Sequence, residues 1–266
     1  MRPLHPTSRG QLLALSEYAR RREGGIPGFP DGTGLGPYEL KVFSQNGEDG
    51  VIGEILRRAG IDGPGFFVEF GAEDGVETNT ALLADVFGWR GVLLEGDPES
   101  HGRLHRKYGP SGRVTTRQTM VEPHTIEGVL AEMGVPADLD LLSIDIDSDD
   151  YWVWKAITGL SPKVVVIEVN THQDPRSAVT QPIGAGPWQG TDFYGASVGA
   201  LRGLAAAKGY RFVHVDLTGN NAFFVRDDVP GDYPAEPLLL GPNHYLLGGA
   251  HPPDATGRAF EVVGGA

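Results

Sequence analysis

Short apolar runs alternate with stretches of helical periodicity along most of the chain. The apolar runs predict strands over 66–71, 91–95, 113–121, 139–147 and 163–170. The stretches between them predict helices over 79–87, 98–108, 126–133 and 149–157. Nearly continuous apolar strands that alternate with helices are typical of a parallel sheet with helices on both faces.

The pattern changes after residue 194. A helix is predicted over 196–208, and two further strands over 210–216 and 221–226. The residues between these strands, 217–220, are too few for the crossover that parallel strands need, so the two strands must form an antiparallel hairpin. We therefore predict an α/β fold in which a Rossmann-like parallel sheet ends in an antiparallel hairpin. An ordinary dinucleotide-binding domain has no such hairpin.

The flanking segments are less regular. A basic helix is predicted over 8–23, and the Gly/Pro-rich stretch 24–37 is a linker or a lid. A helix over 44–60 is expected to be capped by Asn46 or Asp49. We divide the chain into an N-terminal helix and linker (1–43), one α/β domain (44–229) and a Pro/Gly-rich extension (230–266), which packs on the domain, covers the pocket or mediates homo-oligomerisation.

Composition narrows the classes of function. The chain has 266 residues, no cysteine and a net charge of −13. The absence of cysteine excludes disulfides, thiolate metal sites and cysteine nucleophiles. The negative charge argues against nucleic acid as a partner. No apolar run is long enough to cross a membrane, and the first residues lack the pattern of a signal peptide, so a cytoplasmic protein without a membrane partner is expected.

The first strand ends in a turn that contains acids and glycines, EFGAEDG (69–75). Gly71 lets the backbone approach a ligand closely, Ala72 lies between, and Gly75 permits the following turn. Glu69 and Asp74 are candidates to receive an ammonium group. A pyrophosphate needs bare amides and is repelled by acids, whereas a sulfonium with an amino group is attracted. The turn therefore favours S-adenosylmethionine over NAD.

The next two strand ends add candidate cofactor contacts. Glu95, followed by Gly96, stands where an acid accepts hydrogen bonds from ribose hydroxyls. Met120 and Val121 end the third strand, where an adenine would lie; the alternative for both is ordinary core packing. Glu95 indicates a nucleoside-containing cofactor but does not distinguish S-adenosylmethionine from NAD, because NAD-binding proteins use an acid in the same way.

Several motifs together resemble the FkbM-type branch of class I S-adenosylmethionine-dependent methyltransferases. They are SQNGEDGVIGEIL (44–56), FFVEFGAEDGVETNTALL (66–83), GVLLEGDPE (91–99), LLSIDIDSDDYWVWKAI (141–157), KVVVIEVN (163–170) and the stretch 194–229. The resemblance implies a Rossmann-like class I methyltransferase fold, with Gly71 and its neighbours around the cofactor and Glu95 at the ribose. It implies no particular acceptor. The extra acids in 144–150 depart from the usual family pattern.

Oxygen-bearing side chains follow the fourth and fifth strands. Asp145 and Asp147 are two residues apart at one strand end, as are Glu168 and Asn170 at the next. Because neighbouring parallel strands end at the same edge, these side chains are expected to gather there. Such oxygen clusters suit Mg²⁺, Mn²⁺ or Ca²⁺. The arrangement resembles metal-dependent O-methyltransferases; the alternative is that the cation is the substrate or S-adenosylmethionine itself.

Methyl transfer to oxygen needs a deprotonated acceptor, so a base or a metal is required. His172, close after Asn170, is the candidate base, and Asp147 is the second catalytic candidate. His214 is expected to be structural, whereas His244 and His251 reach the pocket only if the extension folds back. In the long loop 171–194, Arg176, Gln181, Trp188 and Tyr194 are candidate contacts for a small polar acceptor.

Four functions stay open at this point. The first is O-methylation of a small polar acceptor such as a sugar or natural product. The second is N- or carboxyl-methylation, which needs less help from a metal. The third is an NAD-dependent oxidoreductase, and the fourth is a nucleotide-binding protein without catalysis.

Overall fold

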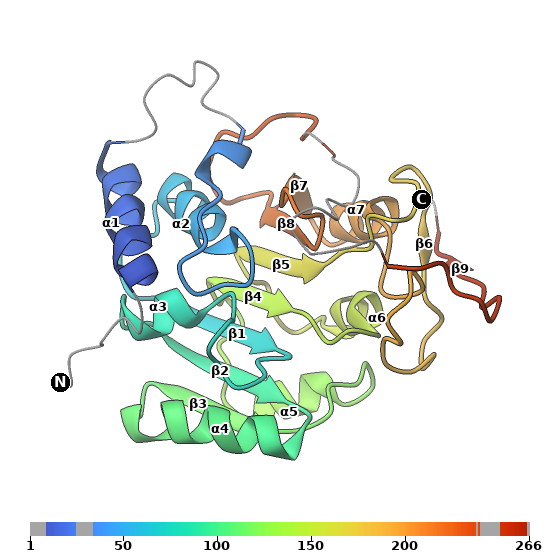
Figure 1. The fold of residues 1–266 in the computed structure, drawn as a ribbon, viewed down its shortest axis with the longest axis horizontal. Helices are drawn as coiled ribbons and strands as arrows, with labels where there is room; N and C mark the ends of the chain where they lie inside the picture. The colour runs from blue at the N-terminus through green and yellow to red at the C-terminus, as the bar shows by residue number, and fades with distance from the viewer. Residues whose placement is uncertain (1–8, 25–33, 238, 240–250, 265–266) are drawn as a thin grey trace.

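The computed structural model describes residues 9–24, 34–237, 239 and 251–264. A seven-stranded sheet with the order β3-β2-β1-β4-β5-β8-β7 forms its centre (Figure 1). Its strands are β1 (Phe66–Phe70), β2 (Arg90–Glu95), β3 (Val114–Gln118), β4 (Leu141–Ile144), β5 (Val164–Glu168), β7 (Tyr210–Val215) and β8 (Asn221–Arg226). The helices are α1 (Arg9–Gly24), α2 (Glu48–Arg58), α3 (Ala81–Asp85), α4 (Pro98–Tyr108), α5 (Ile126–Glu132), α6 (Asp150–Ala156) and α7 (Val198–Ala207), with two short 3-10 turns, η1 (Gly36–Tyr38) and η2 (Gly109–Ser111).

Strand direction identifies the fold. The strands β3, β2, β1, β4 and β5 are parallel neighbours. The strand β8 runs antiparallel between β5 and β7, so the hairpin inserts its second strand next to the parallel set. Five parallel strands extended by such a hairpin form the Rossmann-like fold of class I methyltransferases. The predicted fold is confirmed.

Alternate side chains of each strand enter two cores. Phe67 and Val166 pack on the side of α2, α3 and α4. Val68 and Ile167 pack on the opposite side with α5, α6 and α7. Trp154, one of the aromatic residues that open α6, is buried against Phe224 and Tyr210, at ring-centroid distances of 5.1 and 5.9 Å. Burial on both faces explains why the central strands are apolar throughout.

Two expected boundaries are wrong, and the first affects the site. The strand β4 ends at Ile144, three residues before its predicted end at Asp147. Helix α2 begins at Glu48 with Gly47 as its N-cap and no side-chain cap. The carboxylate of Asp49 instead accepts the backbone N–H groups of residues 42, 43 and 44 at 2.7–2.8 Å. It therefore folds the preceding loop rather than capping the helix.

The segments outside the central alternation also pack on the domain. On α1, the ring centroid of Tyr18 lies 5.6 Å from that of Phe87, which is two residues beyond the end of α3. The short strand β6 (Val179–Thr180), within the long loop, pairs with β9 (Glu261–Val262) of the C-terminal extension (Figure 1). The sequence analysis did not predict this small two-stranded sheet. Residues 25–33 of the expected linker and His244 lie outside the described residues.

None of the helices in the described part is long and apolar enough to cross a membrane.

Candidate active site

A cleft of about 1150 Å³ lies at the carboxyl ends of the parallel strands. In an open α/β sheet this is where ligands bind. The side chains and backbone around it come from Gln45, Glu69, Gly71, Glu73, Glu77, Thr78, Asn79, Glu95, Gly96, Asp97, Pro98, Ser100, Arg103, Thr119, Met120, Val121, Asp145, Ile146, Asp147, Ser148, Glu168, Trp188, Tyr194, Asn220, Asn221 and His251.

Gly71 begins the turn after β1 with a positive φ of 72°. A Cβ atom built at Gly71 would lie 1.7 Å from the carbonyl oxygen of Asp145, so only glycine lets these two strand ends pass each other. Gly71 lines the cleft, and its role as a cofactor contact stays a prediction.

The rest of the turn differs from the prediction. Glu73, which the sequence analysis passed over, has a positive φ of 46° and lines the cleft. Asp74 does not line it: its carboxylate accepts the N–H of Val76 at 3.0 Å. Ala72 is fully buried, and a Cβ built at Gly75 would meet Leu104 of α4 at 2.6 Å. The turn therefore aims Glu73, not Asp74, at a ligand.

Glu69 is a buried acid that holds the turn together. Its carboxylate accepts the N–H of Asn79 at 2.9 Å and both the N–H and the hydroxyl of Thr80. Burial raises the pKa of Glu69 to about 7, against these hydrogen bonds, which lower it. These three hydrogen bonds leave about one lone-pair site for an ammonium group, the role that the sequence predicts for Glu69. The observed role of Glu69 is to fix the segment that follows the turn.

Glu95 links the ends of β1 and β2. Its two carboxylate oxygens accept the N–H groups of Glu73 and Asp97, each at 2.7 Å. A carboxylate has about four lone-pair sites, so capacity for ribose hydroxyls remains. Met120 lies beside Gly96, where its Sδ would be 2.5 Å from an added Cβ. Met120 is 69% exposed and lines the cleft, so it does not pack in the hydrophobic core.

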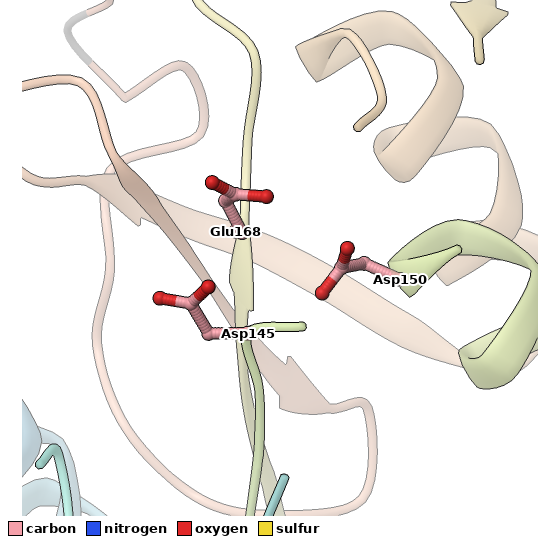
Figure 2. Close-up of side chains that lie close together, drawn as sticks. All are labelled: Asp145, Asp150 and Glu168. Carbon is pink, nitrogen blue, oxygen red and sulfur yellow. The ribbon is translucent and has the colours of Figure 1, made fainter. Parts of the chain in front are cut away.

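Three carboxylates converge beyond β4 and β5 (Figure 2). Each of Asp145, Asp150 and Glu168 offers one oxygen, and the three oxygens lie within 4.8 Å of one another. Burial, followed by the charges of its acidic neighbours, raises the pKa of both Asp145 and Glu168 well above the ordinary values. Burial raises the pKa of Asp150 to about 6. Ionised carboxylates at this spacing repel one another unless a cation lies between them.

The composition of this cluster corrects the sequence analysis. Asp150 replaces Asp147, because β4 ends at Ile144 and Asp147, at a φ of 56°, no longer follows strand alternation. Asn170 is fully buried; its amide donates to the carbonyls of Asp192 and Tyr194, and its oxygen accepts the N–H of His172. Asn170 therefore shapes the loop, and its predicted part as a metal ligand is not favoured.

Among the histidines that the structure describes, one from the C-terminal extension lines the cleft. His251 lines the cleft, whereas His172 is not among the residues that line it. The His172 ring packs behind, with its centroid 5.2 Å from that of His251. The extension folds back over the site, which the sequence analysis left open. His214 is buried in β7 and its Nε2 lies 2.9 Å from Glu39, in agreement with the expected structural role.

Two of the four loop candidates reach the cleft. Trp188 and Tyr194 line it. Arg176 is exposed and pairs with Asp174 at 3.3 Å, and Gln181 is buried with its amide donating to the carbonyl of Gly186 at 3.2 Å. Polar character alone did not separate the residues that build the loop from those that face a ligand.

The electrostatics of the cleft are strongly one-sided. Eight of its lining residues are acids. The lining side chain with a permanent positive charge is Arg103, which pairs with Glu99 at 2.7 Å and lies 3.8 Å from Asp74. A cleft of this charge attracts cations and repels phosphates and carboxylates.

Comparison with known proteins adds only distant structural likeness. No family model matches the chain, and no curated protein matches its sequence. Among solved structures, it is similar to a SAM dependent methyltransferase from Aquifex aeolicus, at 11% identity and a TM-score of 0.38, with 65% of this chain and 87% of that chain covered. It is also similar to an RNA methyltransferase from Salinibacter ruber in complex with S-adenosyl-L-homocysteine, at 17% identity and a TM-score of 0.35, with 71% and 96% covered. Aeropyrum pernix fibrillarin with natively bound S-adenosyl-L-methionine matches at 11% identity and a TM-score of 0.40, with 61% and 66% covered. The description of the fold rests on the strand order of this chain itself.

Proposed function

We propose that the protein is an S-adenosylmethionine-dependent methyltransferase that methylates a hydroxyl of a small polar acceptor, such as a sugar or natural product. The observation that supports this most is the acid-lined turn after β1. Glu73 lies in the turn where a dinucleotide-binding protein offers bare amides to a pyrophosphate. A carboxylate at this place repels a phosphate and attracts the ammonium and sulfonium groups of S-adenosylmethionine. The specific FkbM-type assignment is part of this proposal.

The residues divide the work along the cleft. Glu95 accepts the ribose hydroxyls, Glu73 faces the charged end of the methyl donor, and Met120 covers the base. S-adenosylmethionine supplies an activated methyl group. In the transfer, the S–CH₃ bond breaks with its electrons staying on sulfur, an O–CH₃ bond forms, and the hydroxyl proton leaves. We assign His251 as the group that takes this proton, in place of His172, because His251 lines the cleft.

A divalent cation fits the carboxylate cluster. Around an ion bound at roughly 2.1–2.6 Å, ligand oxygens are at most about 5 Å apart, and the three oxygens lie within 4.8 Å of one another. Oε2 of Glu168 is buried and has no hydrogen-bond partner among the described residues, which is costly unless a cation meets it. Asp145, Asp150 and Glu168 would hold Mg²⁺ or Mn²⁺, whose chemistry there is to lower the pKa of an acceptor hydroxyl.

N- or carboxyl-methylation is the alternative enzyme activity. An amine acceptor is nucleophilic once neutral and needs no metal. Turnover that survives a chelator would favour it. An anionic carboxylate acceptor fits poorly, because the cleft already gathers eight acids.

Calorimetric titration with S-adenosylhomocysteine tests the proposal, first with Mg²⁺ and then with EDTA. Micromolar affinity in both conditions is the expected result and moves the work to acceptor screening. No binding of S-adenosylhomocysteine together with binding of NADH would overturn it. Cofactor binding without turnover on any hydroxyl or amine would favour a non-catalytic nucleotide-binding protein.

A further inference from the structure

One part of the cleft combines aromatic rings with an acid, Asp147, that forms no ion pair with the described residues. Trp188, Tyr194 and His251 contact one another nearly edge to face: the Trp188 ring centroid is 4.7 Å from that of His251 and 6.3 Å from that of Tyr194. All three line the cleft. They form a corner of π surface beside the carboxylate cluster.

Asp147 lies directly at this aromatic corner. The backbone N–H of Trp188 donates to the carbonyl of Asp147 at 3.1 Å, which fixes the two residues to each other. The carboxylate of Asp147 lines the cleft, takes no part in the Asp145–Asp150–Glu168 cluster, and has no ion pair with any described residue. The proposed metal site therefore makes no use of the Asp147 carboxylate.

Tyr194 offers a hydroxyl to the same part of the cleft. The residue lines the cleft and is 6% exposed, and its hydroxyl makes no hydrogen bond to the described residues. Burial and the nearby carboxylates of Glu168, Asp145 and Asp147 raise the pKa of Tyr194, so the hydroxyl stays protonated and faces acidic surroundings.

The other acids of the cleft already have functions. Glu69 holds the chain after the turn, Glu77 pairs with Lys41 at 2.9 Å, and Asp97 caps α4 through the N–H of Ser100. Glu73 and Glu95 face the methyl donor in the proposed function. The charge balance therefore leaves Asp147 for a cation that is neither the cofactor nor the metal.

We propose that Asp147, Trp188 and Tyr194 form a subsite for a protonated amine on the acceptor, which makes the substrate a hydroxyl-bearing amine such as an amino sugar. This rests on the proposed function. The ammonium group lies against the ring of Trp188 and donates to the carboxylate of Asp147. The hydroxyl of Tyr194 donates to an oxygen of the same molecule. A neutral sugar keeps the contact with the Trp188 ring and the hydrogen bond from Tyr194 but lacks the charge-assisted bond to Asp147.

The test compares two sugars that differ in one substituent, D-glucosamine and D-glucose, by calorimetry at slightly acidic pH, with and without S-adenosylhomocysteine. Glucosamine is expected to bind at least tenfold more tightly. Asp147→Asn should bring the two affinities to within about twofold. This variant keeps the side-chain shape, and asparagine tolerates the positive φ at this position. Trp188→Leu should weaken glucosamine binding, and Trp188→Phe should retain most of it.

The proposal is overturned if glucosamine does not bind, if glucose binds equally well, or if Asp147→Asn leaves the preference intact. The separate titration of S-adenosylhomocysteine keeps the two proposals distinguishable. A preference for glucosamine without any cofactor binding would contradict the proposed methyltransferase activity and support the amine subsite. Cofactor binding without this preference would support the methyltransferase activity and contradict the amine subsite.

Discussion

The carboxylate of Glu95 accepts the backbone N–H of Glu73 at 2.7 Å and so connects the end of β2 to the turn after β1. One side chain thereby orients the turn and presents its remaining lone pairs to the cleft. The residue predicted to bind the ribose is also the one that shapes the neighbouring contact.

Glu95→Gln should weaken S-adenosylhomocysteine binding at least tenfold, because the amide loses one acceptor and one charge-assisted contact, about 1.5–3 kcal/mol in total. Glu99→Gln is the matched control. Glu99 stands in the first turn of α4, and its exposed carboxylate pairs with Arg103 at 2.7 Å. Equal affinities of the two variants, measured by calorimetry, would remove Glu95 from the cofactor site.

Gly71→Ala should destabilise the protein and abolish cofactor binding. An alanine Cβ would collide with the Asp145 carbonyl at 1.7 Å, so the ends of β1 and β4 would have to separate. Gly60→Ala is the control, because Gly60 has a φ of 70° but nothing within 4 Å of an added Cβ. The control should cost only about 1 kcal/mol, for the left-handed backbone alone, and Gly71→Ala clearly more in denaturant unfolding. Similar losses in the two variants would contradict the close approach.

Stability should fall as pH rises from about 4.5 to about 7. The folded pKa of Glu69 is about 7, above its ordinary 4.5, so the folded protein binds more protons in this window. Glu69 alone accounts for about 3 kcal/mol. Urea unfolding across this range in the wild type and in Glu69→Gln measures the slope. The variant, although less stable overall, should show a shallower slope; an unchanged slope would mean that Glu69 is ionised throughout.

Asp150→Asn should reduce Mn²⁺ affinity at least tenfold. Its neighbour Asp149 gives the control, because Asp149 accepts the N–H of Gly184 at 3.1 Å and is outside the cluster. Asp149→Asn should leave the affinity within about twofold of the wild type. Calorimetry without cofactor or acceptor gives the readout. If the wild type binds no Mn²⁺, the metal site is contradicted, and the three carboxyl groups must instead avoid repulsion by sharing protons.

The fold was predictable because the apolar pattern is strong in the elements that form it. The runs FFVEF (66–70) and VVVIE (164–168) appear as β1 and β5 with almost the predicted bounds. The hairpin followed from the short connection between β7 and β8. Its insertion beside β5 depends on pairing between distant residues, such as Val165 with Phe224, which the local pattern does not contain.

The site was predictable only where strands carry it. Glu95 and Asp145 were identified because each stands at a strand end. Asp150 was missed because it begins a helix, where an acid is ordinarily explained by the helix dipole. His251 was predicted to reach the pocket only on the condition that the extension folds back, because the fold of the extension depends on tertiary contacts. One of them is the N–H of Asp254 donating to the side chain of Asp192 at 2.8 Å.

The small β6–β9 sheet joins two segments that contribute no strand to the central sheet. Val179 of the long loop pairs with Val262 of the C-terminal extension, and these two segments bring Trp188, Tyr194 and His251 to the cleft. The turns of the central sheet supply the other side, where Gly71 tolerates no larger residue. Under the proposed function, substitutions in the loop and the extension can therefore change the preferred acceptor without altering the methyl-donor site.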